Sequence, residues 1–123
     1  MPSDRFVGGL NVPDKRWGRF DATWPLGVLT VDDGGLTLVP RGLLARVSAG
    51  LVVRLVDVTC AYPLRGRVAW RGVGFDFEDG RTAYFWTFGQ RDSALDALRA
   101  RGVRVSPVPR TAAAIRKPWR HSG

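Results

Sequence analysis

The two side chains whose chemistry best suits a catalytic centre are a single cysteine, Cys60, and a single histidine, His121. A general acid or base must be held in a pocket, and a nucleophile needs a base beside it. His121 lies almost at the end of the chain, where such geometry is hard to hold, and Cys60 lies in a predicted strand with no histidine near it in the sequence. Cys60 therefore suits a small buried position. We expect no catalytic residue and a protein that is not an enzyme.

The densest group of carboxylates is Asp76, Glu78 and Asp79, a pattern that would be compatible with metal binding. Asp76 and Glu78 alternate with apolar residues, however, which is typical of the solvent-facing side of a strand that ends in a turn. One cysteine also cannot form an internal disulfide or a thiolate zinc cluster. We expect neither a metal nor another cofactor.

A basic loop is the most site-like segment, because Arg65, Arg67 and Arg71 surround Trp70. Guanidinium groups pair with carboxylates or phosphates, and tryptophan offers a flat face for stacking. The loop is therefore a candidate binding site for an acidic protein segment or an anionic head group. A solvated basic loop, with Trp70 packed back onto the domain, is the alternative interpretation.

The C-terminal tail combines cations with an aromatic residue: Arg116, Lys117, Trp119 and Arg120. This composition suits contact with an anionic membrane surface. At about 1 kcal/mol per basic residue near an acidic leaflet, the five basic residues of 104–123 would supply at most about 5 kcal/mol, so the contact would be weak, reversible and salt-sensitive. A flexible tail without lipid contact is the alternative.

The net charge of +8 over 123 residues is unevenly distributed. Residues 104–123 hold five basic and no acidic residues, whereas the centre of the chain is nearly neutral. The length fits one small domain. A nucleic-acid-binding barrel is the runner-up function, because the pI is about 11.2 and five tryptophans are available for stacking. The weakly charged centre and the lack of a recognised motif argue against nucleic acid as the partner.

No stretch of the sequence has the apolar length of a signal peptide, or the roughly 20 apolar residues of a membrane-spanning helix. We therefore expect a cytoplasmic protein whose tail contacts, at most, the inner membrane face.

The elements that would position these side chains are mostly strands. Residues 23–31 and 36–39 have strand patterns and flank Asp32-Asp33-Gly34-Gly35, a typical hairpin turn sequence. Two further short strands are predicted at 51–54 and 59–64.

Two segments in this half of the chain lack a clear pattern. Residues 1–22 show no periodicity and are predicted to form an irregular N-terminal arm that packs on the domain through Phe6, Trp17 and Phe20. Residues 41–50 fit either a strand extension or a short helical turn.

A second hairpin is predicted around Asp79-Gly80. Before it, Val73–Glu78 alternates, with Val73, Phe75 and Phe77 on the face expected to be buried. After it, Thr82–Phe88 is predicted to be the returning strand.

One helix is predicted, over Arg91–Arg101, where Ala94, Leu95 and Leu98 form an apolar stripe. Gly102 is placed as its C-terminal cap.

Several short motifs resemble those of bacterial pleckstrin-homology-like domains, in particular the short stand-alone ones of high-GC Gram-positive (actinobacterial) species. They are Trp24-Pro25-Leu26, Gly35-Leu36-Thr37-Leu38, Arg41-Gly42-Leu43-Leu44, Asp57-Val58, Gly72-Val73-Gly74-Phe75, Asp79-Gly80, Phe85-Trp86-Thr87-Phe88, Ala97-Leu98-Arg99 and Gly102-Val103. The resemblance implies a bent, partly open barrel over residues 23–103, with about seven antiparallel strands in two near-orthogonal sheets and a helix over about 91–102 plugging one end. The basic tail 104–123 would be flexible.

The resemblance also implies the class of function: a non-enzymatic interaction or scaffolding module for a protein or peptide partner. Related barrels accept an extended peptide between an edge strand and the C-terminal helix. Here that groove would be bordered by Ser93, Asp96 and Ala97 and by a strand among residues 51–64. Specific phosphoinositide binding is not expected, since the hairpin that carries basic residues in lipid-binding members is Asp32-Asp33-Gly34-Gly35 here.

Overall fold

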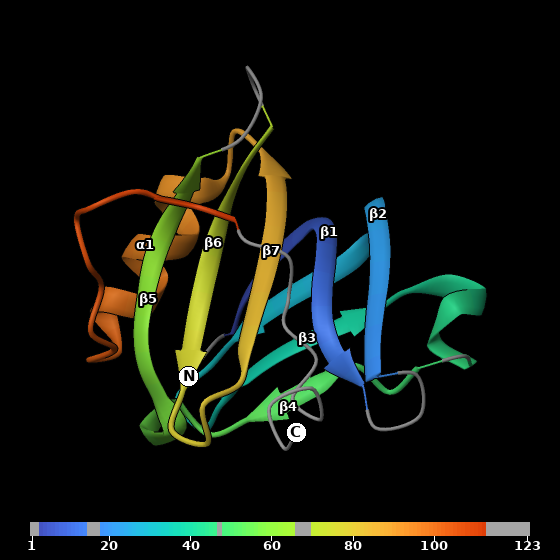
Figure 1. The fold of residues 1–123 in the computed structure, drawn as a ribbon, viewed down its shortest axis with the longest axis horizontal. Coiled ribbons are helices and arrows are strands. Elements are labelled where there is room, and N and C mark those ends of the chain that lie inside the picture. The colour runs from blue at the N-terminus through green and yellow to red at the C-terminus, as the bar shows by residue number, and fades with distance from the viewer. Residues whose placement is uncertain (1–2, 15–17, 47, 66–69, 113–123) are drawn as a thin grey trace, which may run out of the picture.

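The computed structural model describes residues 3–14, 18–46, 48–65 and 70–112, with only the backbone at Trp70. Within them the chain is mainly β, with one α-helix towards the C-terminus (Figure 1). The strands are β1 (Asp4–Asp14), β2 (Gly18–Val31), β3 (Leu36–Pro40), β4 (Leu51–Val53), β5 (Val58–Arg65), β6 (Trp70–Phe77), β7 (Thr82–Phe88) and β8 (Arg110–Thr111). The helices are α1 (Arg91–Ala100) and two short 3-10 helices, η1 (Gly42–Arg46) and η2 (Leu55–Asp57). The predicted class, mainly β with a C-terminal helix, is confirmed.

All eight strands belong to one sheet, in the order β4-β3-β2-β1-β7-β6-β5-β8. Neighbouring strands are antiparallel except β5 and β8, which run parallel. Among the described residues the two outermost strands, β4 and β8, do not pair with each other. The sheet is therefore continuous but is not closed into a barrel.

The prediction of an irregular N-terminal arm over residues 1–22 is wrong for the part that the structure describes. Asp4–Asp14 forms β1, which pairs with β2 along most of its length and with β7 around Leu10. The strand pattern is hard to see in the sequence because Gly8 and Gly9 interrupt it, at the point where the register with β2 shifts. Phe6 is buried in the core as expected. The sheet thus begins at residue 4, well before residue 23.

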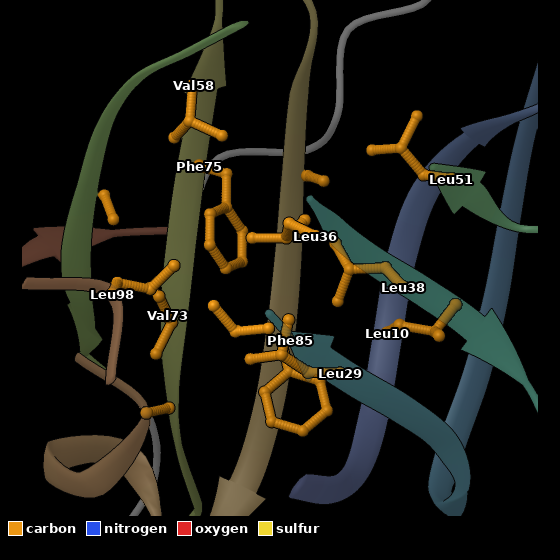
Figure 2. Close-up of a cluster of buried hydrophobic side chains, with 14 of the residues drawn as sticks. Leu10, Leu29, Leu36, Leu38, Leu51, Val58, Val73, Phe75, Phe85 and Leu98 are labelled. Atoms are coloured by element: carbon orange, nitrogen blue, oxygen red, sulfur yellow. The ribbon is translucent and has the colours of Figure 1, made fainter. Parts of the chain in front are cut away.

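One hydrophobic core is lined by both halves of the sheet and by the helix (Figure 2). Its fully buried side chains include Leu29, Leu36 and Leu38 from β2 and β3, and Val73, Phe75 and Phe85 from β6 and β7. Leu98 of α1 completes it. Since strands from both sides of β1 contribute to the same cluster, the sheet must bend around it.

The helix is built as its sequence indicates. Ala94, Leu95 and Leu98 are buried, together with Ala97. Gly102 has φ +85° and donates to the Arg99 carbonyl, while the amide of Val103 donates to the Leu98 carbonyl. These two bonds form a Schellman cap, which needs a left-handed residue where Gly102 stands.

A second, smaller cluster lies on the opposite side of β6 and consists of Tyr62, Leu64 and Tyr84. The Tyr62 ring lies over Gly74, where an added Cβ would come within 2.1 Å of the ring. Val73, Phe75 and Phe77 are buried as predicted. The other face of β6, expected to be solvent-facing, is partly covered by this cluster.

The remaining segments settle two open points. Residues 41–50 contain the 3-10 helix η1, so the helical-turn alternative is the correct one. The prediction of a flexible tail fails for residues 104–112, because Val105 bridges to Ala61 and β8 pairs with β5.

Arg101, immediately after α1, ties the helix to the N-terminal strand and to the β2–β3 turn. Its Nη1 donates to Asp4 Oδ2 at 2.7 Å and to the Ala97 carbonyl at 3.2 Å, and its Nε lies 3.5 Å from Asp33 Oδ1. Its side chain is only 13% exposed. In contrast, the nearby Arg99–Asp96 pair is well exposed on both sides.

Replacing Arg101 by alanine is expected to lower the free energy of unfolding by about 2 kcal/mol, since charged hydrogen bonds in a partly buried setting are lost. The matched variant, Arg99→Ala, removes an exposed ion pair and should cost no more than about 0.5 kcal/mol. Denaturant unfolding of both variants measures the difference, and equal losses would contradict the role given to Arg101.

Replacing Gly74 by alanine is expected to destabilise the protein by about 1–3 kcal/mol, because the new methyl group would overlap the Tyr62 ring. Gly34→Ala is the control, since its nearest contact would be an ordinary 3.6 Å. Thermal unfolding should show a clear decrease in Tm for the first variant and little change for the second.

Candidate functional site

Exposed aromatic and basic residues lie at the end of the sheet where β5 and β7 end and β6 begins, at the top of Figure 1, the aromatic ones on its outer face and Arg71 on its core face. We call this surface the aromatic–arginine rim. It consists of Trp24, Leu26, Arg41, Arg65, Arg71 and Phe88.

The apolar half of the rim is produced by a bulge in β2. Ala22 pairs with Leu10 and Gly27 with Gly8, so the four residues 23–26 stand opposite Gly9 alone. These four residues are all exposed. The bulge carries Trp24, whose ring lies 5.4 Å from that of Phe88 in an edge-to-face arrangement.

The exposure of these side chains is large for their size. Trp24 is 48% exposed, Leu26 38% and Phe88 51%. Contiguous apolar surface of this kind on a small protein commonly marks a place where another molecule binds. Tryptophan and arginine are also the residues most enriched among those that dominate binding energy at protein interfaces.

Strand pairing determines where the basic residues of the rim lie. The Arg41 amide donates to the Leu26 carbonyl at 2.8 Å, which places Arg41 next to the bulge. Leu64 pairs with Gly72, so Arg65 and Arg71 occupy the next positions on the two neighbouring strands. Like charges at facing positions of a sheet repel each other. An anionic group bound between them would remove that repulsion.

The rim arginines differ from most other described arginines in forming no ion pair with a described carboxylate. Seven described arginines lie within 4.0 Å of a carboxylate: Arg19, Arg54, Arg81, Arg91, Arg99, Arg101 and Arg110. In the described ranges, Arg41, Arg65 and Arg71 are exposed and form no ion pair. Their charges are therefore available to a ligand.

The structure brings together only part of the predicted basic loop. Arg65 and Arg71 belong to the rim, whereas Arg67 and the Trp70 side chain lie outside what the structure describes. The backbone of Trp70 pairs with Phe88, so the loop leaves the sheet beside the aromatic half of the rim. The four residues of the tail prediction, Arg116, Lys117, Trp119 and Arg120, also lie outside the described residues.

Sequence reasoning missed Trp24, Leu26, Arg41 and Phe88 as site residues. A signal existed for Phe88, because alternation along Thr82–Phe88 places Tyr84, Trp86 and Phe88 on the face opposite Phe85. No such signal exists for Trp24, whose exposure depends on the bulge opposite Gly9.

The predicted peptide groove beside β5 is already occupied by the chain itself. The Ala61 amide donates to the Arg104 carbonyl at 2.8 Å, and the Ser106 amide donates to the Ala61 carbonyl at 2.8 Å. Farther along, β8 pairs with the end of β5. This occupancy counts against an added peptide strand at this edge. Ser93 and Asp96 are exposed and Ala97 is buried.

Arg110 holds residues 104–111 against the outer face of the sheet. Its guanidinium lies 3.9 Å from the centre of the Tyr62 ring, and its Nη1 lies 3.0 Å from Asp76 Oδ2. The Tyr62 hydroxyl donates to the other Asp76 oxygen at 3.3 Å. Burial raises the pKa of Tyr62, and the negative charge of Asp76 raises it further.

Neither a protein-family model nor a curated protein sequence matches this chain. The functional assignment therefore depends on the residues themselves. Within the described part of the chain, no group of three or more His, Cys, Asp or Glu is placed to hold a metal ion. Cys60 is half-buried, and its thiol faces the Ala61 carbonyl at 3.4 Å. No helix among the described residues is long and apolar enough to cross a membrane.

Raising the pH above about 10 is expected to destabilise the protein through Tyr62. The unfolded chain releases this phenol proton near the ordinary tyrosine pKa of 10.0, whereas the folded chain keeps it to higher pH. The folded state then binds more protons, so the free energy of unfolding falls as pH rises. Tyr62→Phe should show a smaller fall than the unaltered protein between pH 8 and about 10.5, as measured by denaturant unfolding. Parallel curves would contradict this account.

Proposed function

We propose that this chain is a non-enzymatic interaction module that binds an anionic partner protein through the aromatic–arginine rim. The observation that carries the proposal is that two kinds of residue lie at the same end of the sheet, Phe88 with Trp24 on its outer face and Arg71 with Arg65 on its core face. Exposed Trp24 and Phe88 offer apolar contact, and Arg65 and Arg71 offer charge that the described chain does not neutralise. An acidic protein surface with an apolar centre would satisfy both.

The architecture supports a module of the pleckstrin-homology-like class. A bent antiparallel sheet in the order β4-β3-β2-β1-β7-β6-β5 surrounds one core, and a C-terminal helix packs against it. This class serves many unrelated functions, so the partner must be inferred from the site. The turn at Asp32-Asp33 joins β2 to β3 and not the first two strands, which are joined by residues 15–17, so its carboxylates do not bear on the phosphoinositide site that the resemblance places in the first hairpin.

A protein partner suits the rim better than a nucleic acid. Bases would need exposed aromatic faces in a row. Tyr84 and Trp86 do lie on the outer face of the sheet, but Tyr62 and Tyr84 are buried and Arg110 is engaged with Asp76. Weak contact of the tail with an anionic inner membrane face, in the cytoplasm, remains part of the proposal as an accessory to protein binding.

The test is affinity capture from a lysate of the native host, with the full chain as bait. Changing both Arg65 and Arg71 to glutamate should lower capture of the partner strongly, because losing one interface hot spot of about 2 kcal/mol corresponds to roughly 30-fold in affinity. Trp24→Ala should do the same. Quantitative mass spectrometry of the captured proteins provides the measurement.

Arg46→Glu is the matched control, since Arg46 is an exposed arginine of η1 without an ion pair in the described ranges. It should leave capture unchanged. The lysate is treated with nuclease and detergent, so that capture through nucleic acid or membrane disappears. The proposal is overturned if the rim variants capture the same proteins as the unaltered chain, or if all capture is lost after these treatments.

A further inference from the structure

The end of the molecule opposite the rim carries acidic and aliphatic side chains. We call this surface the acidic pole. It consists of Asp32, Asp33, Val52, Val56 and Glu78.

The acidic pole is contiguous in the structure. The β2–β3 turn lies against the end of β4, since a Cβ on Gly35 would come within 2.8 Å of the Val53 carbonyl. From there η2 leads into β5, and the Glu78 amide donates to the Asp57 carbonyl at 2.9 Å. The turn sequences 32–35 and 78–81 therefore lie on either side of the exposed η2.

Carboxylates are in excess at this pole. Asp33 shares Arg101 with Asp4, so one arginine faces two carboxylates. Asp32 accepts only backbone hydrogen bonds, from Gly34 and Gly35, among the bonds described. Glu78 is exposed and forms no ion pair with any described residue.

Exposed aliphatic side chains accompany this negative charge. Val52 is 70% exposed and Val56 is 73% exposed. The acidic pole thus resembles the rim in placing exposed apolar side chains beside charged ones, but here the residues without an ion pair in the described chain, Asp32 and Glu78, are negative.

The strands hold the two surfaces at opposite ends of the molecule. β5 runs from Val58, beside η2, to Arg65 at the rim, and β7 runs from the 78–81 turn to Phe88 at the rim. In Figure 1 the turn between β6 and β7 lies at the bottom, and the ends of β5 and β7 lie at the top.

We propose that the partner of the rim is a second copy of this chain, bound through its acidic pole in a head-to-tail contact. This rests on the proposed function of the rim as a binding site for an acidic protein surface. Arg65 and Arg71 meet Glu78 and the β2–β3 turn of the next copy, while Trp24 and Phe88 pack against its Val56. A pair formed in this way keeps one free rim on one copy and one free pole on the other, so the contact continues from copy to copy into a filament or a closed ring.

Charge complementarity selects this arrangement over a two-fold symmetric dimer. Two rims facing each other would bring arginines against arginines, and two acidic poles would bring carboxylates against carboxylates. Only the rim of one copy against the pole of another pairs opposite charges while also covering apolar surface on both sides. Some of these contacts are solvent-exposed ion pairs, which dissolved salt screens. The assembly is therefore expected to weaken as salt is added.

The experiment is sedimentation velocity of the full chain over a concentration series at low and at high salt. The unaltered protein is expected to show species heavier than the 13.6 kDa monomer at low salt, decreasing at high salt. The rim variant, Arg65→Glu with Arg71→Glu, and the pole variant, Glu78→Ala with Val56→Ser, should each sediment as monomers. Circular dichroism and cooperative unfolding establish that both variants are folded.

Mixing the two variants gives the decisive result. The rim variant retains an intact pole and the pole variant retains an intact rim, so one of each should form a complex that stops at two copies. Arg46→Glu serves as the control and should assemble like the unaltered chain. The proposal is overturned if the unaltered chain stays monomeric at low salt, if either variant still assembles alone, or if the mixture does not associate.

This outcome is separable from that of the proposed function. Capture of a host protein that depends on Arg65 and Arg71, by a chain that stays monomeric, would keep the rim as a protein-binding site and refute the second copy as its partner. Self-assembly that the rim variant abolishes would support both.

Discussion

The rest of the structure depends on the passage of β1 through the centre of the sheet. At Gly8 and Gly9 this strand changes register against β2 and continues along β7, so one strand belongs to both halves. An added Cβ on Gly8 would come within 1.9 Å of the Trp86 carbonyl, and one on Gly9 within 2.8 Å of the Ala22 carbonyl. Side chains are excluded there because two backbones approach closely, and that approach allows the sheet to bend around a single core.

The exposed surface at the top of the sheet follows from the same constraint. While β1 contributes the single residue Gly9, β2 contributes the four residues 23–26, so the excess chain projects outward with Trp24 on it. The neighbouring strand ends then add Phe88, Arg65 and Arg71. The backbone geometry that bends the sheet around its core thus also projects Trp24 outward at this end of the sheet.

Sequence reasoning succeeded where the pattern is local. The β6–β7 hairpin around Asp79-Gly80 and the helix ending at Gly102 are encoded by alternation, turn residues and an apolar stripe within about 10 residues of each other. Two of the six rim residues, Arg65 and Arg71, were predicted in the same way, as part of a cluster of cations.

The failures share a physical cause, which is that these strands are defined by their pairing partners and not by a local sequence pattern. β1 interrupts its own alternation with Gly8-Gly9, and β8 follows Pro107 and Pro109, which are unfavourable strand residues. β1 pairs with β2 along most of its length and with β7 at Gly9, Leu10 and Asn11, and β8 pairs with β5. Trp24 was missed as a site residue for the same reason, since its exposure depends on a register mismatch with a strand that was not predicted.

The short strand β8 also bears on the solubility of the protein. An unpaired strand edge is a template on which other chains can add and aggregate. Residues 104–111 cover one edge of β5, and the outermost strand on the other side, β4, has only three residues. A chain shortened after Val103 would expose the eight-residue edge of β5 together with the Tyr62 and Leu64 side chains. Residues 104–111 therefore protect the edge of β5 from pairing with other chains, whatever the basic residues of this segment bind.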